Sequence, residues 1–306
     1  MHQVQLRIFG SLALAASLAA GTAPALASLT AAEIVTKNVA ARGGLEAWRS
    51  VKTMSLSGKM GAGGNRRAAL QVPMQDRASV VSRKTEEPQL PTRRVEEVNL
   101  PFVMDLARPG KMRLELQVAK QTALQVYDGT NGWKLRPFLN RLEVEPYTAE
   151  EKKAASVQSD LDGPLVDYAA KGTRIELEGT EKVEDRDTFK LKLIQKSGDV
   201  THVWVDAQTY LESKIEGRPR RLDGTDHPVE VYYRDYRTVN GLQIPFVLET
   251  RVLPVAKTAT GFRDTPVPPE KIVIDKVAIN PIFDAGLFAK PTVATKPPQG
   301  SAQASR

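Results

Sequence analysis

Residues 108–138, RPGKMRLELQVAKQTALQVYDGTNGWKLRPF, decide the fold class of this chain. Apolar and polar residues alternate from the start of the stretch, so that one side collects Met112, Leu114, Leu116 and Val118. A period of two is typical of a β-strand with one apolar face and one solvated face. The alternation returns at residues 123–127 and 133–138, on either side of the turn-forming sequence DGTNG. The stretch therefore predicts three consecutive antiparallel strands.

The same alternation continues through most of the chain. It is present at residues 53–60 and 66–72, and again from residue 174 to residue 279, with hairpin turns at Ser197-Gly198 and Asn240-Gly241. Trp204 is out of phase with its neighbours Val203 and Val205, which predicts that it lies on the outer face. We count roughly ten strands, which indicates a large antiparallel sheet.

Helices are few. Thr30 and Glu33 form a capping box for a first helix, which is followed by a further turn with Trp48 facing inward. A second helical region begins at the capping box of Thr148 and Glu151. We expect it to continue through residues 162–172, with Pro164 at a first helical position and Gly172 at the end. Asp160 and Asp162 are then interpreted as acidic residues at a helix N-terminus.

The two termini are expected to lie outside the folded domain. Residues 1–27 have the features of a secretory signal peptide, because an apolar segment follows a weakly basic start and Ala25-Leu26-Ala27 offers a cleavage site. Residues 28–290 form one domain, and residues 291–306, rich in Pro, Ser, Gln and Lys, are expected to be disordered. The polar segment at residues 84–97 is expected to be a loop or a ragged edge. We therefore expect a periplasmic protein that is soluble after cleavage.

Composition excludes several classes of protein. The chain has no cysteine, so neither disulfides nor thiolate zinc sites contribute to its stability. Lys and Arg number 43 against 36 Asp and Glu, a net charge of +7 that is spread thinly. This weak basicity fits a soluble surface or contact with anionic lipid. Export and the lack of a basic aromatic motif argue against nucleic acid as a partner.

A large sheet with one apolar face has to bury that face against another part of the structure or a ligand. Another sheet, a few helices or a ligand are the available covers. The alternation alone leaves two architectures open, a closed sandwich of two sheets and an open half-barrel with helices as a partial lid.

Several motifs resemble a known family. RPGKMRLE followed by YDGTNGW resembles the signature of periplasmic lipoprotein carriers of the LolA type, and residues 279–291 resemble the end of the same superfamily. Residues 160–193 and 232–246 are similar to a larger subgroup described as outer membrane lipoprotein-sorting proteins. The resemblance spans most of residues 30–291. This chain is longer than the smallest carriers, which leaves the identity of the cargo open.

The resemblance implies a mainly antiparallel β fold with a few α-helices, an incomplete half-barrel covered by helices. It implies a periplasmic carrier that holds acyl chains of lipoproteins or lipids in an apolar cavity and transfers them towards the outer membrane. Its partners would be an inner-membrane donor, an outer-membrane acceptor and, transiently, a membrane. The alternative is an envelope sensor or interaction module that recognises lipoprotein or lipid through the same fold.

Candidate ligand-binding residues follow from the pattern and the resemblance. The apolar strand residues are candidate cavity liners, with an ordinary protein core as the alternative: Met104, Met112, Leu114, Leu116, Val126, Trp133 and Leu135. Arg108 matches the arginine of the family's R-P motif, which is associated with holding the lid shut. The alternative for Arg108 is an exposed arginine that precedes a turn.

Catalysis is not expected. Beyond the signal peptide the chain has two histidines, His202 and His227, and neither belongs to a metal-ligand motif. No nucleophile elbow and no glycine-rich phosphate loop occurs. We therefore expect no catalytic residue, no metal and no cofactor, and a hydrolase is the third hypothesis.

Overall fold

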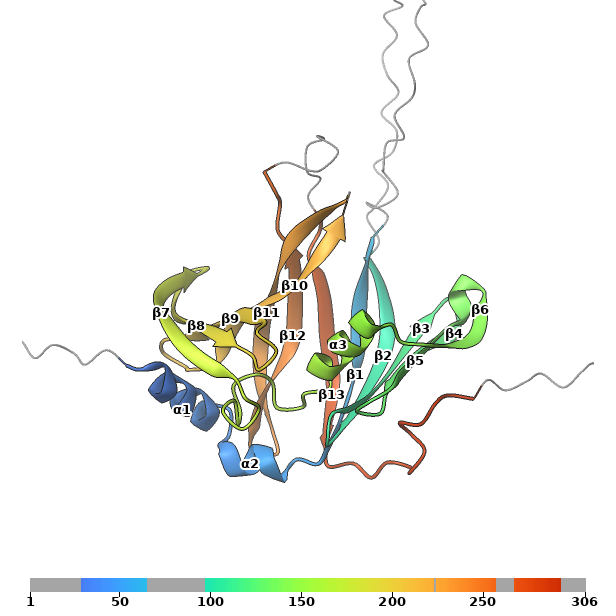
Figure 1. Cartoon of the computed structure of the whole chain (residues 1–306), viewed down its shortest axis with the longest axis horizontal. Helices are drawn as coiled ribbons and strands as arrows, with labels where there is room; N and C mark the ends of the chain where they lie inside the picture. Colours follow the sequence, from blue (N-terminus) through green and yellow to red (C-terminus); the bar gives the residue numbers. More distant parts are fainter. Residues whose placement is uncertain (1–28, 65–96, 223, 257–266, 293–306) are drawn as a thin grey trace, which may run out of the picture.

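The computed structural model describes residues 29–64, 97–222, 224–256 and 267–292 (Figure 1). The predicted signal peptide, the predicted strand at residues 66–72, nearly all of the predicted loop at 84–97 and most of the C-terminal tail lie outside these ranges. None of the helices in the described part of the chain is long and apolar enough to cross a membrane.

One sheet dominates the described chain. Its thirteen strands are β1 (Thr53–Gly64), β2 (Glu97–Ala107), β3 (Lys111–Val118), β4 (Gln121–Tyr127), β5 (Gly132–Arg136), β6 (Arg141–Pro146), β7 (Arg174–Val183), β8 (Arg186–Ile194), β9 (Val200–Asp206), β10 (Glu212–Leu222), β11 (Thr225–Val239), β12 (Leu242–Val252) and β13 (Glu270–Ile279). The strands that the alternation did not predict are β2 and β6.

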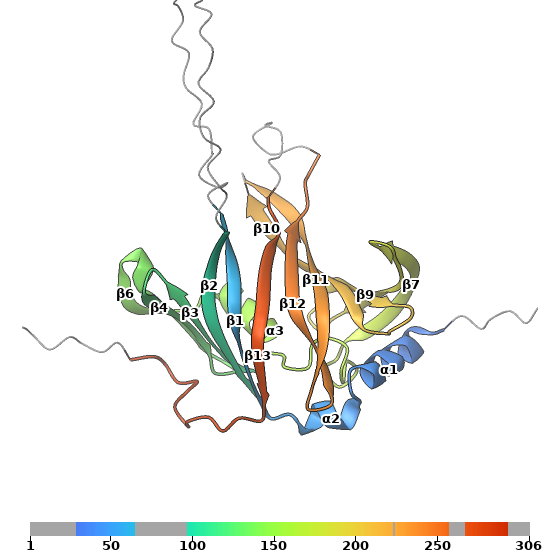
Figure 2. The ribbon, with the colours of Figure 1, turned by 180° about the vertical axis from the view of Figure 1, so that it is seen from behind.

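The sheet is antiparallel and unclosed. Its spatial order is β6-β5-β4-β3-β2-β1-β13-β12-β11-β10-β9-β8-β7, so β6 and β7 are its two edges. Two meanders, β2 to β6 and β7 to β12, flank the central pair of β1 and β13 (Figures 1 and 2). Among the described residues no second sheet faces this one, so the sandwich alternative does not hold for this part of the chain.

Three α-helices accompany the sheet: α1 (Ala31–Ala41), α2 (Leu45–Ser50) and α3 (Ala149–Gln158). Both predicted capping boxes are present, at Thr30 with Glu33 and at Thr148 with Glu151. Trp48 of α2 is 2% exposed, which confirms that it faces inward. A short 3₁₀ turn, η2 (Pro137–Leu139), joins β5 to β6.

The helices pack on one face of the sheet, which we call the inner face. Helix α1 places Ile34 and Val35 against buried residues of β8 and β9, among them Leu191 and Val203. Helices α2 and α3 contribute to a second apolar cluster with β1 to β4, β12 and β13. The inner face therefore carries two apolar clusters side by side along the curved sheet.

The predicted helix at residues 162–172 is wrong. Helix α3 ends at Gln158, and residues 159–173, which we call the bridging segment, form a series of turns. Gly163 and Asp167 have φ angles of 76° and 51°, which lie outside the helical region. Leu165 and Val166 are fully buried, but they point into different clusters, Leu165 with α1 and Val166 with α2. The bridging segment thus joins the two clusters. A single helical face would direct its apolar side chains into one cluster only.

Trp204 lies on the outer face, as its phase predicted. It is buried there with Val183 and Tyr232, and the Lys214 ammonium lies 3.9 Å from the centre of the Trp204 ring. Because Trp204 and its neighbours Val203 and Val205 point to opposite faces, β9 is covered on both sides.

Candidate functional site

The strand register builds a continuous apolar wall on the inner face. Directly opposed residues in an antiparallel sheet point to the same side. The register aligns, across β13, β1, β2 and β3, the rows Ile279, Met54, Leu106 and Met112, then Val277, Leu56, Met104 and Leu114, then Ile274, Gly58, Phe102 and Leu116, and finally Ile272, Met60 and Leu100. We call these rows the inner wall.

The two ends of the inner wall differ in burial. At the end next to α2, Met54 and Met112 are 4% and 1% exposed. At the other end Met60, Leu116 and Ile272 are only half-buried. The strands extend beyond the helices at this end (Figure 1). Apolar surface therefore continues past the part of the wall that the helices cover.

The structure brings four of the predicted liners together on the inner wall. Met104, Met112, Leu114 and Leu116 all belong to the apolar cluster around α2 and α3. Met112 is buried, whereas the other three are half-buried. These four residues therefore share the face of the sheet on which the helices pack.

The other three predicted liners, Val126, Trp133 and Leu135, point to the opposite face. The β3–β4 register pairs Leu114 with Gln125 and Leu116 with Ala123, so the odd positions of β4 share the inner wall. Val126 pairs with Trp133, and Leu124 pairs with Leu135. The prediction failed because a one-residue change of register moves every side chain of a strand to the other face.

Val126 is fully buried on the outer face, beside the C-terminal segment. Its cross-strand partner is Arg113, whose guanidinium donates a 3.4 Å hydrogen bond to the Leu287 carbonyl. The segment after β13 runs along this side of the sheet (Figure 2). The C-terminal segment is therefore attached to the outer face next to Val126 through Arg113.

Helix α3 is anchored to the edge of the inner face at Gly132. The Tyr147 ring lies against Gly132, where a Cβ atom would come within 1.9 Å of Tyr147 Cδ2. Lys134 of β5 forms an ion pair with Glu151 in the first turn of α3. Burial raises the pKa of Tyr147 to about 12, so this ring stays neutral. Together these contacts fix where α3 crosses the sheet.

We expect Gly132→Ala to lower the free energy of unfolding by about 2 kcal/mol or more, because the new methyl group forces Tyr147 out of its site. Chemical denaturation measures the change. Gly286→Ala is the matched control, since a Cβ atom at Gly286 meets nothing within 4 Å. Equal stability of the two variants would contradict this packing.

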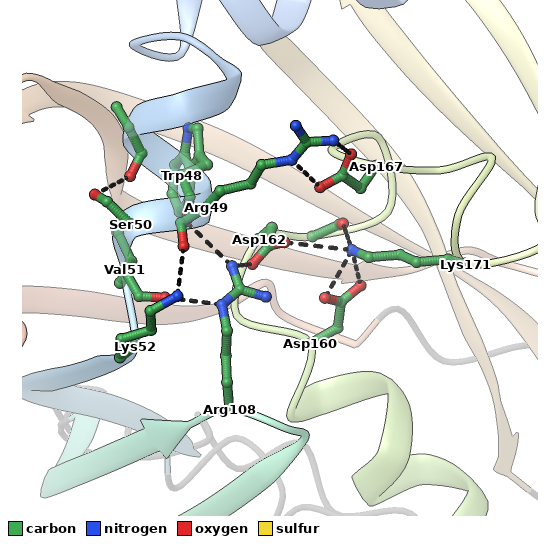
Figure 3. Close-up of polar contacts among 12 residues, drawn as sticks. Trp48, Arg49, Ser50, Val51, Lys52, Arg108, Asp160, Asp162, Asp167 and Lys171 are labelled. Carbon is green, nitrogen blue, oxygen red and sulfur yellow. Dashed lines mark hydrogen bonds and ion pairs between the residues drawn. The ribbon is translucent and has the colours of Figure 1, made fainter.

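Arg108 lies at the junction of β2, α2 and the bridging segment (Figure 3). Its Nε donates to the Val51 carbonyl at 2.8 Å and its Nη2 to the Trp48 carbonyl at 3.1 Å. Nη2 also pairs with the carboxylate of Asp162, a side chain that is only 3% exposed. Arg108 therefore binds two carbonyls at the end of α2 and, in addition, a buried acid. We call this group the Arg108 junction.

A second cation holds the bridging segment from within. Lys171 donates to both carboxylate oxygens of Asp160, at 2.8 and 2.7 Å, and to the Gly163 carbonyl at 2.7 Å (Figure 3). Its ammonium lies 3.9 Å from the Asp162 carboxylate. Burial raises the pKa of Asp160, and the nearby Lys171 acts against that rise. The two aspartates are thus partners of basic side chains rather than N-terminal acids of a helix, which corrects the prediction.

Two further arginines connect helices α1 and α2 to the same segment. Arg42 donates a 2.7 Å hydrogen bond to the Asp162 carbonyl and forms a 3.2 Å ion pair with Glu212 of β10. Arg49 makes a two-point contact with Asp167 at 3.0 and 2.7 Å. The bridging segment is therefore attached to both helices by charged groups and to both clusters by apolar ones.

The histidines are engaged in local contacts. His202 lies in β9, with Nδ1 2.6 Å from Glu216 and Nε2 3.4 Å from Glu178. His227 is 1% exposed, with Nδ1 3.2 Å from the Leu253 carbonyl. Within the described residues, no cluster of His, Cys, Asp or Glu has an arrangement suited to a metal ion.

A cavity of about 450 Å³ lies at the foot of the outer face. Its lining combines Lys52, Arg108 and Lys111 with residues of the C-terminal segment, including Phe283 and Phe288. Thr53, Ala107 and Lys111 are opposed in the register and belong to the outer face. This cavity is therefore separate from the inner wall, although Arg108 borders both regions.

Comparison with known proteins gives structural matches alone. No protein-family model and no curated protein matches the sequence. Among solved structures, the chain is similar to a LolA superfamily protein from Nitrosomonas europaea, with 11% identity, a TM-score of 0.48, and coverage of 86% of this chain and 99% of that one. This neighbour belongs to the superfamily that the motifs of the chain resemble.

Two other neighbours are similar to the same extent. A chain described as an outer membrane lipoprotein-sorting protein domain from Vibrio parahaemolyticus shows 11% identity and a TM-score of 0.47, over 84% of this chain and 95% of that one. A DUF1329 family protein from Desulfovibrio piger shows 12% identity and a TM-score of 0.49, over 84% and 96%. The fold of this chain is described above from its own strands, and its function is argued below from its own residues.

Proposed function

We propose that this protein is a periplasmic carrier that binds acyl chains of lipoproteins or lipids on its inner wall and transfers them towards the outer membrane, without catalysis. In this proposal the sheet is a half-barrel, and α1 to α3 with the bridging segment form a partial lid over it. An inner-membrane donor and an outer-membrane acceptor would exchange cargo with the protein.

The observation that carries the proposal is the uneven burial of the inner wall. Methionine, leucine and isoleucine side chains continue from a buried core into a half-buried end, and no second sheet faces them among the described residues. Soluble proteins rarely leave contiguous apolar surface without a partner. Flexible methionine side chains such as Met60 and Met104 adapt to guests of variable shape.

The energetics favour a carrier over free diffusion. Each methylene group removed from water contributes about 0.8 kcal/mol, so an acyl chain of about a dozen methylenes contributes on the order of 10 kcal/mol. A lipidated molecule does not cross water readily against such a cost. The inner wall offers the chain an apolar surface that is continuous with the protein's own core.

The Arg108 junction supports a controllable lid. Arg108 connects the sheet to α2 and to the bridging segment through two carbonyls and one carboxylate. Arg108 is 31% exposed, so water can reach its guanidinium, and Lys171 stays 3.9 Å from the buried Asp162 carboxylate when Arg108 moves away. We propose that the junction holds the helices over the wall in the empty protein and separates when an acyl chain enters.

The test is transfer of cargo. Protein purified under gentle conditions is examined by native mass spectrometry for bound lipid, and is then incubated with donor vesicles that contain a fluorescent diacyl lipopeptide and with acceptor vesicles. A carrier shows bound lipid and accelerates transfer in proportion to its concentration. Binding without faster transfer would favour a sensor, and bare protein without transfer would contradict both functions.

A further inference from the structure

The turn between β5 and β6 exposes an unusual amount of apolar surface. Residues 136–142, RPFLNRL, form what we call the hairpin tip. Phe138, Leu139 and Leu142 are 37%, 50% and 58% exposed. Three large apolar side chains on one short turn are costly in water unless a partner covers them.

The hairpin tip has a defined shape. Pro137 begins the short helix η2, and Asn140 ends it in the left-handed conformation with φ at 57°. The Asn140 amide donates a 2.9 Å hydrogen bond to the Pro137 carbonyl. The apolar residues are therefore held on a fixed turn. This turn leads into β6, the edge strand of the sheet (Figure 1).

The hairpin tip and its surroundings carry a small excess of basic charge. Arg136 and Arg141 flank the apolar residues, and the exposed acid Glu143 follows them on β6. Both arginines contact Glu145 of β6, at 2.6 and 3.4 Å, so their positions are fixed. Lys120 is exposed in the β3–β4 turn, at the same end of the adjoining strands. Apolar side chains flanked by arginine and lysine are typical of segments that bind anionic membranes.

The register places the hairpin tip at the half-buried end of the inner wall. Leu135 of β5 is opposite Leu124, Leu124 is opposite Glu115, and Glu115 is opposite Val103. This path leads to the end of the sheet that carries Leu116 and Met60, away from α2. A membrane bound at the tip would therefore adjoin the uncovered apolar surface.

We propose that the hairpin tip is a docking site for an anionic lipid bilayer, with Phe138, Leu139 and Leu142 inserted among the acyl chains and the flanking basic residues at the phosphates. This inference rests on the proposed carrier function and deepens it, because it assigns the expected membrane contact to the sheet edge, outside the inner wall. Docking would hold the open end of the wall at the membrane surface.

Flotation of the purified protein with vesicles tests the proposal. We expect the protein to float with vesicles that contain phosphatidylglycerol and to bind less to vesicles of phosphatidylcholine alone. Phe138→Ser combined with Leu139→Ser should weaken binding to the anionic vesicles by about tenfold. Val157→Ser on α3 is the matched control, since Val157 is 57% exposed on a different element, and should bind as the unmodified protein does.

Two outcomes would overturn the proposal. One is unchanged flotation of the double variant, with circular dichroism and thermal melting showing that it is folded. The other is a concentration-dependent dimer that the double substitution abolishes, which would make a second copy the partner. Because flotation needs no cargo, a failed docking test leaves the carrier proposal to its own transfer assay.

Discussion

We expect Ile272→Glu to abolish the acyl-chain binding that we propose for the inner wall, whereas Val273→Glu, at the next position of the same strand, should leave it unchanged. Ile272 lies on the inner wall between Met60 and Leu248, while Val273 is 38% exposed on the outer face opposite Lys59. A carboxylate on the wall either loses its water when a hydrocarbon chain arrives or excludes the chain. We expect affinity for a fluorescent fatty acid to fall by at least about a hundredfold in the Ile272 variant.

The pair of variants separates binding from general damage. Both introduce the same charge into β13, so both report on strand stability in thermal melts. Ile272→Gln adds a neutral polar group at the wall and should lose less affinity than the glutamate. Equal affinity of the Ile272 and Val273 variants would remove the inner wall as the site of cargo.

Loss of Arg108 has the second large effect. Arg108→Leu should lower the free energy of unfolding by about 2 kcal/mol, because it leaves the Asp162 carboxylate buried without its main partner. This loss in the free energy of unfolding is smaller than the loss expected for a fully buried ion pair, because Arg108 is 31% exposed and Lys171 lies 3.9 Å from Asp162. Chemical denaturation of three variants measures the coupling: Arg108→Leu, Asp162→Leu and the protein that carries both substitutions. The double variant should lose less than the sum of the two singles.

Arg174→Leu is the control for this experiment. Arg174 is 70% exposed and pairs with Glu176 on the surface at 3.0 Å, so its removal should change stability by less than about 0.5 kcal/mol. If Arg108 also acts as a latch, its leucine variant exchanges the fluorescent lipopeptide with vesicles faster than the unmodified protein does. Additive losses in the double variant would show that Arg108 and Asp162 act independently.

The sequence predicted the antiparallel sheet because alternation is a local property. Met112, Leu114 and Leu116 share a face whatever strand lies next to them. The face of Val126 and Trp133 depends instead on the turn at Ala119 and Lys120, which sets the pairing of β3 with β4. Alternation within each strand is the same for either register, so it did not reveal this choice.

Strands β2 and β6 were missed for different reasons. β2 contains Pro101 and a run of apolar residues at 100–104, which obscures the period of two. In β6 the apolar side chain of Leu142 is exposed at a sheet edge, so its alternation does not mark a buried face. In both strands, pairing with neighbours decides the structure more than local preference does.

The helices show where local signals end. Both capping boxes were correct, because Thr30 and Thr148 bond to groups only three residues away. The bridging segment has local helix signals at Pro164 and Gly172. However, Lys171 binds the Asp160 carboxylate, Arg108 binds the Asp162 carboxylate, and Arg42 binds the Asp162 carbonyl. Two of these three partners are remote in sequence, so the pattern of the segment alone did not predict their effect.

The pairing of β1 with β13 has a consequence for how the protein reaches its native state. These strands come from opposite ends of the domain, yet they lie at the centre of the sheet and join its two meanders. Each meander closes through short hairpins as the chain emerges, but the central ladder has to wait for residues 270–279. Until β13 pairs with β1, the apolar inner faces of both meanders are exposed to other polypeptides. Biogenesis therefore has a vulnerable interval that lasts until β13 has been delivered.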